Sequence, residues 1–357
     1  MNNFSIASKA YQAPDPSTLE GPILVTGTAG FIGFHTAKAL LDLGLEVVGL
    51  DNLSDYYDVR IKHARTGILQ NYKGFSFYQE DLAHYDAVKA IFEKYQFKYV
   101  IHLAAQAGVR YSLTHPFPYL KSNIDGFLSL LECTRYTKGF KHMAYASSSS
   151  VYGMNTKMPF SEEDPVNHPM SLYAVTKRSN ELMAQSYFHL YKIPLTGLRF
   201  FTVYGPYGRP DMAAFKFLDA IFAGTPIDVY NYGNMARDYT FVGDTVMGIL
   251  GATKTIPDTS GDSAAIYNLG NHKLETLSHF IETLEKHAGH TAIKNMLPIQ
   301  PGDVPQTVAD ITKAQQDFGY APSTSIEEGL EYFVAWYKEY FKDQLKENLP
   351  GFSNSVM

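Results

Sequence analysis

The chain has 357 residues, 45% of them hydrophobic and 18% charged, and a formal net charge of −6 at pH 7. These values are typical of a globular protein with a large core and more than one lobe. The acidic balance argues against nucleic acid or an anionic membrane as a partner, because such ligands attract basic proteins. No segment approaches the ~20 apolar residues that a membrane span requires.

The two ends of the chain and its cysteine content bear on its location. Residues 1–20 are polar, contain Pro14 and Pro16, and lack the apolar core of a secretory signal, so we expect a flexible tail. Residues 345–357 are expected to form a second tail. Cys133 is the only cysteine, which excludes an internal disulfide and fits a reducing, cytoplasmic location.

From residue 21 to about 204, short apolar runs alternate with helical patterns. Runs that are apolar throughout and separated by helices are typical of a parallel sheet covered on both faces. This order predicts an α/β fold with a Rossmann-type doubly wound parallel sheet. The expected strands are 23–26, 45–50, 75–78, 100–104, 143–147 and 195–201.

A glycine-rich turn joins the first expected strand to a helix over 31–43. Gly27 permits a tight turn, Gly30 lets a pyrophosphate approach the helix N-terminus, and Gly33 allows the helix to pack closely on the strand. This context predicts a dinucleotide site. Asp51 ends the second strand, where its carboxylate would accept the ribose hydroxyls and repel a 2′-phosphate, so NAD is favoured over NADP. A turn or helix-cap role is the alternative for this aspartate.

Two later strand ends are expected to complete the cofactor site. Asp81 and Leu82 follow the third strand and would face the adenine. Leu103, Ala104 and Ala105 follow the fourth strand, where the small alanines would let the cofactor lie against the backbone.

The sequence changes character after Phe201, because the following turn is rich in glycine and proline. We expect an NAD-binding Rossmann domain over 21–204, to which 236–270 return. A smaller C-terminal substrate-binding lobe is expected from 205–235 and 271–344.

Two longer helical patterns, 118–136 and 171–191, carry apolar residues on more than one face. Part of that surface could pair with a second subunit as a four-helix bundle, which would make the protein a homodimer. Burial of the same residues within one chain is the alternative.

The strongest catalytic signal is a tyrosine and a lysine four residues apart, Tyr173 and Lys177, which share one helix face. The lysine ammonium favours the phenolate and is expected to lower the pKa of the tyrosine from about 10. Ser148, within the serine run 147–150, would hold the reacting oxygen. The set predicts that Tyr173 acts as a general base on a hydroxyl group while hydride leaves for a nicotinamide.

Other patterns are interpreted as structural. Tyr85 and Lys89 repeat the tyrosine–lysine spacing without a serine run at a matching distance, so we expect a solvated helix face there. His102 is expected to be a core residue of its strand. The 12 histidines show no metal-ligand spacing, and we expect no metal site.

The motifs Thr-Gly-x-x-Gly-x-x-Gly, Ser-Ser-Ser-Ser-Val-Tyr-Gly and Tyr-x-x-x-Lys resemble the extended short-chain dehydrogenase/reductase family. Within it, the chain is similar to NAD-dependent nucleotide-sugar epimerases, and most of all to UDP-glucuronate 4-epimerases, from about residue 22 to 340. The specific matches are 51–58, 105–112, 199–206 and 208–213. The resemblance implies an isomerase that interconverts UDP-glucuronate and UDP-galacturonate through a 4-keto intermediate with tightly bound NAD.

The resemblance also assigns roles to individual residues. Ser148, Tyr173 and Lys177 carry the catalytic roles. The additional cofactor residues are Phe31, Ile32, Asn52, Phe200 and Val203.

The implied substrate site has two parts. Arg209 and Arg237 would hold the UDP and Asp303 would lie at the nucleoside, with Arg110 also contacting the substrate. The hydroxyls suited to a sugar carboxylate, which they could bind without repelling it, belong to Ser149, Ser150 and Thr202. For each of the UDP-holding arginines, a surface salt bridge is the alternative.

Three other functions stay open. A 4-epimerase of a neutral UDP-sugar, such as UDP-glucose or UDP-N-acetylglucosamine, more often carries asparagine where this chain has Thr202. Nucleotide-sugar dehydratases and decarboxylases place an acidic residue where this chain has Ser149 and Ser150. A non-catalytic NAD-binding protein on the same fold would often lack the tyrosine–lysine pair, which is complete here.

Overall fold

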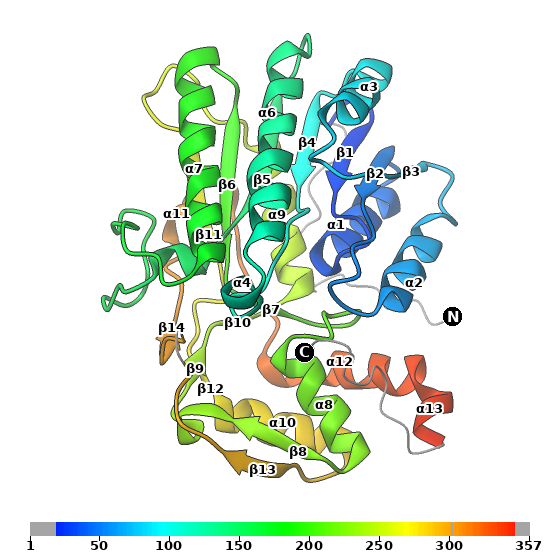
Figure 1. The fold of residues 1–357 in the computed structure, drawn as a ribbon, viewed down its shortest axis with the longest axis vertical. Helices are drawn as coiled ribbons and strands as arrows, with labels where there is room; N and C mark the ends of the chain where they lie inside the picture. The colour runs from blue at the N-terminus through cyan, green and yellow to red at the C-terminus, as the bar shows by residue number, and fades with distance from the viewer. Residues whose placement is uncertain (1–18, 301–302, 347–357) are drawn as a thin grey trace.

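The computed structural model describes residues 19–300 and 303–346. Its main sheet has seven parallel strands in the order β11-β6-β5-β4-β1-β2-β3 (Figure 1). The expected doubly wound parallel sheet is therefore confirmed. The strands are β1 (Ile23–Thr26), β2 (Val47–Asp51), β3 (Phe75–Gln79), β4 (Tyr99–His102), β5 (His142–Ser148), β6 (Leu195–Phe200) and β11 (Ala265–Leu269).

Helices cover both faces of this sheet. Alternate residues of β1 supply the two cores: Leu24 packs with one layer, while Ile23 and Val25 pack with the other. The Leu24 layer contains α3 (Tyr85–Tyr95), α6 (Gly126–Tyr136) and α7 (Leu172–Tyr191), with α6 and α7 side by side in Figure 1. The opposite layer contains α1 (Phe31–Asp42), α2 (Val59–Leu69), α9 (Val242–Lys254) and α11 (Thr312–Phe318).

Most of the expected strands differ from the observed ones by one or two residues at their ends, and for two of them the hydrogen bonding shows the reason. β2 begins at Val47 rather than at residue 45, because the Leu45 amide still donates to Leu40 O (3.1 Å) and closes α1. The expected strand over 195–201 ends one residue earlier, at Phe200 of β6. A separate short strand, β7 (Thr202–Tyr204), follows it and pairs with β10 (Tyr239–Phe241). The chain thus leaves the main sheet at Phe201, and Thr202 comes to lie past its edge.

The long helix expected over 118–136 is interrupted. It consists of α5 (Phe117–Tyr119), a π-helical segment η2 (Leu120–Asp125) and α6. Asn123 lies in the π-helical segment, and its carbonyl oxygen accepts a hydrogen bond from Asn180 Nδ2 (2.7 Å). A side chain that bonds into the helix ladder is a known cause of such bulges.

A smaller group of elements lies below the carboxyl ends of the strands in Figure 1. It contains α8 (Ala213–Ala223), α10 (Leu277–Ala288) and α12 (Ile326–Tyr340), with β8 (Pro226–Val229) parallel to β13 (Ile293–Met296). Three short strands form a further sheet: β9 (Ala236–Arg237), β12 (Glu275–Thr276) and β14 (Gln306–Thr307). The other short helices are α4 (Tyr111–Thr114), η3 (Ser149–Tyr152), η4 (Tyr230–Gly233) and α13 (Lys342–Lys346).

The expected division into two lobes remains a proposal. α11 lies in the range 271–344 that was expected for the smaller lobe, yet it packs on β11 and α9 of the larger group. β9 lies in the range 236–270 that was expected for the Rossmann domain, yet it pairs with strands of the smaller group. The expected tails lie mostly outside the described residues, at 1–18 and 347–357. Across 19–300 and 303–346, no helix is long and apolar enough to cross a membrane.

Candidate active site

One large cleft, of about 1310 Å³, lies between the carboxyl ends of the strands and the smaller group of elements. Parallel sheets of this type bind ligands at this edge, next to the point where the strand order reverses. Every site residue expected from the sequence lines this cleft. The cleft therefore gathers residues that are as far apart in the chain as Gly27 and Asp303.

The glycine-rich turn forms one end of the cleft and opens α1. Gly27 has a φ of 77°, which favours glycine, and a Cβ on Gly33 would lie 2.0 Å from Gly27 O. Gly30 is the N-cap of α1, and no side chain caps this helix end. Its N–H groups therefore suit an anionic pyrophosphate, so these residues fit a dinucleotide.

Asp51 lies at the end of β2, as expected. Its two carboxylate oxygens accept backbone hydrogen bonds from Ala29 N (3.0 Å) and Leu53 N (2.8 Å). The alternative turn role is thus present, but a carboxylate has about four acceptor positions, which leaves two for ribose hydroxyls. Asp81 is held nearby by an ion pair with Lys121 (3.0 Å).

Ser148 and Tyr173 face each other across the middle of the cleft. Ser171 caps α7 by accepting a hydrogen bond from Ala174 N (3.1 Å), which fixes the first turn that carries Tyr173. Ser148 Oγ accepts from Ser150 N (3.2 Å), so its own O–H can be donated into the cleft. Lys177 is buried, and its Nζ donates to Ala146 O (2.8 Å).

The prediction that the pKa of Tyr173 is lowered is wrong. Burial raises the pKa of Tyr173, and the hydrogen bond with Ser148 and the charge of Arg209 oppose this effect without cancelling it. Burial also lowers the pKa of Lys177 to about 8. The Lys177 ammonium donates to Ala146 O, and burial is the largest influence on the pKa of both residues.

The hydroxyls proposed for a carboxylate lie on two neighbouring turns. Ser149 and Ser150 begin η3, directly after β5. Thr202 begins β7, where its backbone N–H donates to Asp238 O (3.1 Å) and its hydroxyl stays partly exposed to the cleft. All three side chains are neutral hydrogen-bonding groups at the wall of one cavity.

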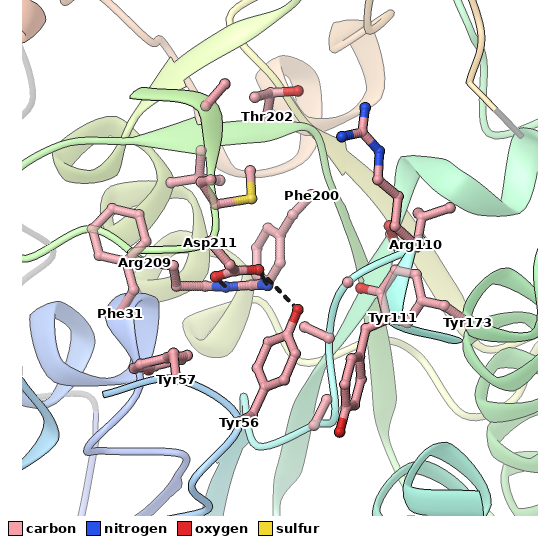
Figure 2. Close-up of a pocket in the computed structure, with 18 of the residues that line it drawn as sticks. Phe31, Tyr56, Tyr57, Arg110, Tyr111, Tyr173, Phe200, Thr202, Arg209 and Asp211 are labelled. Atoms are coloured by element: carbon pink, nitrogen blue, oxygen red, sulfur yellow. Dashed lines mark hydrogen bonds and ion pairs between the residues drawn. The ribbon is translucent and has the colours of Figure 1, made fainter. Parts of the chain in front are cut away.

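Arg209 forms a bidentate ion pair with Asp211, through Nε to Oδ1 (2.9 Å) and Nη2 to Oδ2 (2.5 Å). Figure 2 shows this pair in the centre of the cleft, with Phe31 and Tyr173 on either side. Tyr56 OH donates to Asp211 Oδ2 (3.0 Å), as the dashed line marks. The guanidinium is mostly buried, which suits recognition of an anion.

Two further expected residues are paired with each other. Arg110 Nη2 lies 3.0 Å from Asp303 Oδ2, and the Arg110 guanidinium stacks over the ring of Tyr230 at 4.8 Å from its centroid. Arg237 donates from Nη1 to Pro305 O (2.9 Å). All three side chains line the same cleft, and the pair of Arg110 with Asp303 joins the larger group of elements to the smaller one.

Several residues of the site were not expected from the sequence. Tyr56 and Asp211 lie in the segments 51–58 and 208–213 that carry the family resemblance, but the sequence assigned neither of them a role. Asn123 anchors the segment before α6 to Gln106 O and to Thr176, next to Lys177 (both 3.0 Å). A single asparagine within an apolar helical pattern carries no spacing signal, so only the fold could identify it.

Among residues 19–300 and 303–346, no group of three or more His, Cys, Asp or Glu could hold a metal ion. His102 is buried in β4 against Thr26 Oγ1 (2.8 Å), and burial lowers its pKa to about 3, so it is neutral. Cys133 is buried in α6.

The sheet, the glycine turn and the Ser–Tyr–Lys set define an extended short-chain dehydrogenase/reductase. A family model described as GDP-mannose 4,6 dehydratase matches residues 24–333. The chain belongs to this family.

Similar proteins agree on the class of reaction. The chain is 46% identical, over 89% of its length and 97% of the relative's, to the probable UDP-glucuronate 4-epimerase of Rhizobium meliloti. It also resembles the solved UDP-glucuronic acid 4-epimerase of Bacillus cereus in complex with UDP-glucuronic acid and NAD, with a TM-score of 0.83, 35% identity, and coverage of 89% and 99%. A UDP-glucose 4-epimerase of Thermotoga maritima with UDP-glucose gives a TM-score of 0.79, 30% identity and the same coverage.

Proposed function

We propose that this protein is an NAD-dependent UDP-glucuronate 4-epimerase, which interconverts UDP-glucuronate and UDP-galacturonate. The observation that carries the proposal is that Ser148 and Tyr173 line one cleft together with the hydroxyls of Ser149, Ser150 and Thr202. The first pair suits proton transfer at a sugar hydroxyl, and the neutral hydroxyls suit a sugar carboxylate. Incubation with UDP-glucuronate and analysis for UDP-galacturonate tests the proposal.

The chain's own groups handle the proton in this reaction. Tyr173 takes the proton from the C4 hydroxyl, and Ser148 holds the same oxygen while it becomes a carbonyl. Bound NAD supplies a reversible acceptor for the C4 hydride. Once the 4-keto sugar has turned about its link to the diphosphate, C4 would take back the hydride on its opposite face while Tyr173 returns the proton to the C4 oxygen, so the product has the opposite configuration at C4.

Binding energy far from the reacting carbon keeps the intermediate in place. Arg209 and Arg237 suit the diphosphate, because a guanidinium stays charged and forks onto phosphate oxygens. Since UDP anchors the sugar remotely, the ring can rotate without leaving the site. The anchoring residues would thus act equally on both orientations of the sugar.

The carboxylate creates a second requirement. A 4-keto glucuronate is a β-keto acid, which loses carbon dioxide when the breaking bond aligns with the carbonyl π system. Hydrogen bonds from Ser149, Ser150 and Thr202 would hold the carboxylate away from that alignment. We therefore expect little UDP-pentose among the products.

A 4-epimerase of a neutral UDP-sugar is the second candidate, because the fold is also similar to a UDP-glucose 4-epimerase. The two functions separate in one assay, in which UDP-glucuronate and UDP-glucose are compared side by side. A preference for UDP-glucose would promote the second candidate. Accumulation of UDP-pentose would instead favour a decarboxylase.

We also propose that two copies pair through α7 and the segment of α5, η2 and α6, as a four-helix bundle, in a reducing cytoplasm. These neighbouring helices expose large apolar side chains: Phe117, Leu120, Leu128, Tyr136, Val175, Leu182 and Leu190. An apolar stripe of this kind is costly in water and suits a partner surface. Light scattering should give a dimer for the native chain and a monomer for Leu182→Arg.

A further inference from the structure

The side chains of Tyr173, Lys177 and Glu181 are spaced four residues apart along α7, so they follow one face of the helix. Lys177 and Glu181 are 1% and 3% exposed. The proposed reaction uses the first two residues and leaves the buried Glu181 carboxylate without a role. A buried carboxylate is costly unless it is fully bonded, so its partners show what it does.

Glu181 is bonded on both carboxylate oxygens. Oε1 accepts from Ser147 Oγ (2.7 Å) and Arg199 Nε (2.8 Å). Oε2 accepts from Arg199 Nη2 (3.0 Å) and Arg178 Nη1 (2.9 Å). These four bonds fill the acceptor capacity of the carboxylate. The ion pair with Arg199 joins α7 to β6, and the bond from Ser147 joins α7 to β5.

Three consecutive residues of β5 thus contact this one face of α7. Ala146 O accepts from Lys177, and the next residue, Ser147, donates to Glu181. The third is Ser148, which lines the cleft with Tyr173 and lowers the pKa of its phenol. The first two contacts fix the register between helix and strand. The third contact is the catalytic pair itself, and its geometry depends on that register.

The same network of hydrogen bonds also holds the short helix η3, which begins with Ser149 and ends with Tyr152. Arg199 Nη1 donates to Tyr152 OH (3.0 Å), and Tyr152 OH donates to Asn268 Oδ1 of β11 (2.7 Å). Tyr152 ends the turn that begins with Ser149. Movement of the Glu181 carboxylate would therefore displace both ends of the segment that runs from Ser147 to Tyr152.

We propose that Ser147 and Glu181 are positioning residues, whose hydrogen bond sets the distance between Ser148 and Tyr173 and so the rate of hydride transfer. This inference rests on the proposed function for its kinetic consequence, but not for its geometry. Ser147→Ala removes the bond from Ser147 to Glu181 and leaves the Glu181–Arg199 ion pair and the bond from Lys177 to Ala146 O intact. A small positional error at a reacting group can lower a rate by up to about 100-fold.

The kinetic test compares wild type, Ser147→Ala and Ser147→Thr, with rates expressed per mole of bound NAD. For Ser147→Ala we expect kcat to fall about 10- to 100-fold. KM should change less than about threefold, and the deuterium isotope effect at C4 should rise because hydride transfer limits the rate. Ser147→Thr keeps the hydroxyl and should recover most of kcat. The control is Ser179→Ala, since Ser179 lies on α7 and donates to Val175 O of the same helix.

A second measurement does not depend on turnover. Ultraviolet titration of the phenolate, taken as wild type minus Tyr173→Phe, reports the Tyr173 pKa. Because the bond with Ser148 lowers that pKa, Ser147→Ala should raise it further. A merely structural role would lower the melting temperature and leave the isotope effect and the titration unchanged.

The outcomes separate the two claims. If wild type forms no UDP-galacturonate, the proposed function fails, and the titration still decides the role of Ser147. If wild type is active and Ser147→Ala retains kcat within about twofold, with an unchanged isotope effect and Tyr173 titration, the positioning role is overturned.

Discussion

Arg110 and Asp303 are separated by 193 residues in the chain, yet their side chains meet at 3.0 Å across the mouth of the cleft. Arg110 follows β4, whereas Asp303 lies between β13 and β14, so the pair links the larger and the smaller group of elements at one end of the cleft. The Arg110 side chain is 53% exposed. Exposed ion pairs contribute only about 0–1 kcal/mol to stability.

Arg110→Met should therefore affect ligand binding much more than folding. We expect KM for the UDP-sugar to rise about tenfold, with kcat nearly unchanged, because the proposed role of Arg110 is to bind the substrate and not to transfer the proton or the hydride. The melting temperature should stay close to that of wild type. Steady-state kinetics and thermal unfolding of the same preparation check both parts, and a loss confined to stability would show that Arg110 has no part in binding.

Tyr173→Phe should keep the fold and the bound cofactor while turnover falls about 10²- to 10⁴-fold, because only the phenolic oxygen moves the proton. Turnover and NAD content are measured on the purified variant. The matched control is Tyr85→Phe, which alters the other tyrosine–lysine pair on the exposed start of α3 and should change little. Near-normal activity of Tyr173→Phe would remove this residue from the mechanism.

Thr202→Val should reduce the use of UDP-glucuronate far more than any use of UDP-glucose. The substitution keeps the shape of the side chain but removes one hydrogen bond to a charged group. Such a bond is worth about 1.5–3 kcal/mol, or roughly 10- to 150-fold in affinity or rate. Both sugars are assayed in parallel, and an equal loss on both would mean that the threonine hydroxyl does not contact the carboxylate.

His279, which does not line the cleft, contributes to the stability of the fold in a way that depends on pH. It contacts Glu275 (3.0 Å) and Glu327 (3.1 Å), which joins α10 to α12, and the hydrogen bond with Glu275 raises the pKa of the histidine. A pKa raised in the folded state gives stability that is present below the unfolded value of about 6.5 and is lost as the pH rises through the folded value.

His279→Gln should accordingly destabilise the protein at pH 5.5 but not at pH 8.5, by about 0.5 kcal/mol because the pair is exposed. The backbone bond from residue 279 to Thr276 Oγ1 is kept in the variant. Denaturant unfolding at the two pH values measures the difference. An equal loss at both would assign the effect to packing rather than charge.

The main sheet could be predicted from the sequence because its strands are apolar throughout and helices separate them. Strand ends such as that of Asp51 followed from the same pattern, and parallel strands bring their carboxyl ends to one edge. The residues that the sequence predicts for the cofactor and for catalysis accordingly line one cleft at this edge. The boundary at Val47 was not, because it depends on how the C-terminus of α1 is closed.

Contacts between residues that are far apart in the chain could not be predicted from the sequence. The contact between Ser147 and Glu181, like that between Asn123 and Thr176, depends on how α7 lies against its neighbours. The pKa of Tyr173 was misjudged because the spacing of Lys177 implied that the lysine would dominate, whereas burial raises this pKa more than Ser148 and Arg209 lower it. Local patterns report which face a residue occupies, but not which partner it meets there.

The central claim is that the C4 hydride leaves the sugar and returns to it within one binding event. The direct measurement uses UDP-glucuronate labelled with deuterium at C4, converted by the purified protein without added cofactor. We predict UDP-galacturonate that retains the deuterium at C4, with none released to water. Formation of UDP-galacturonate that has lost the label, or a requirement for free NAD in amounts equal to the product, would contradict the account.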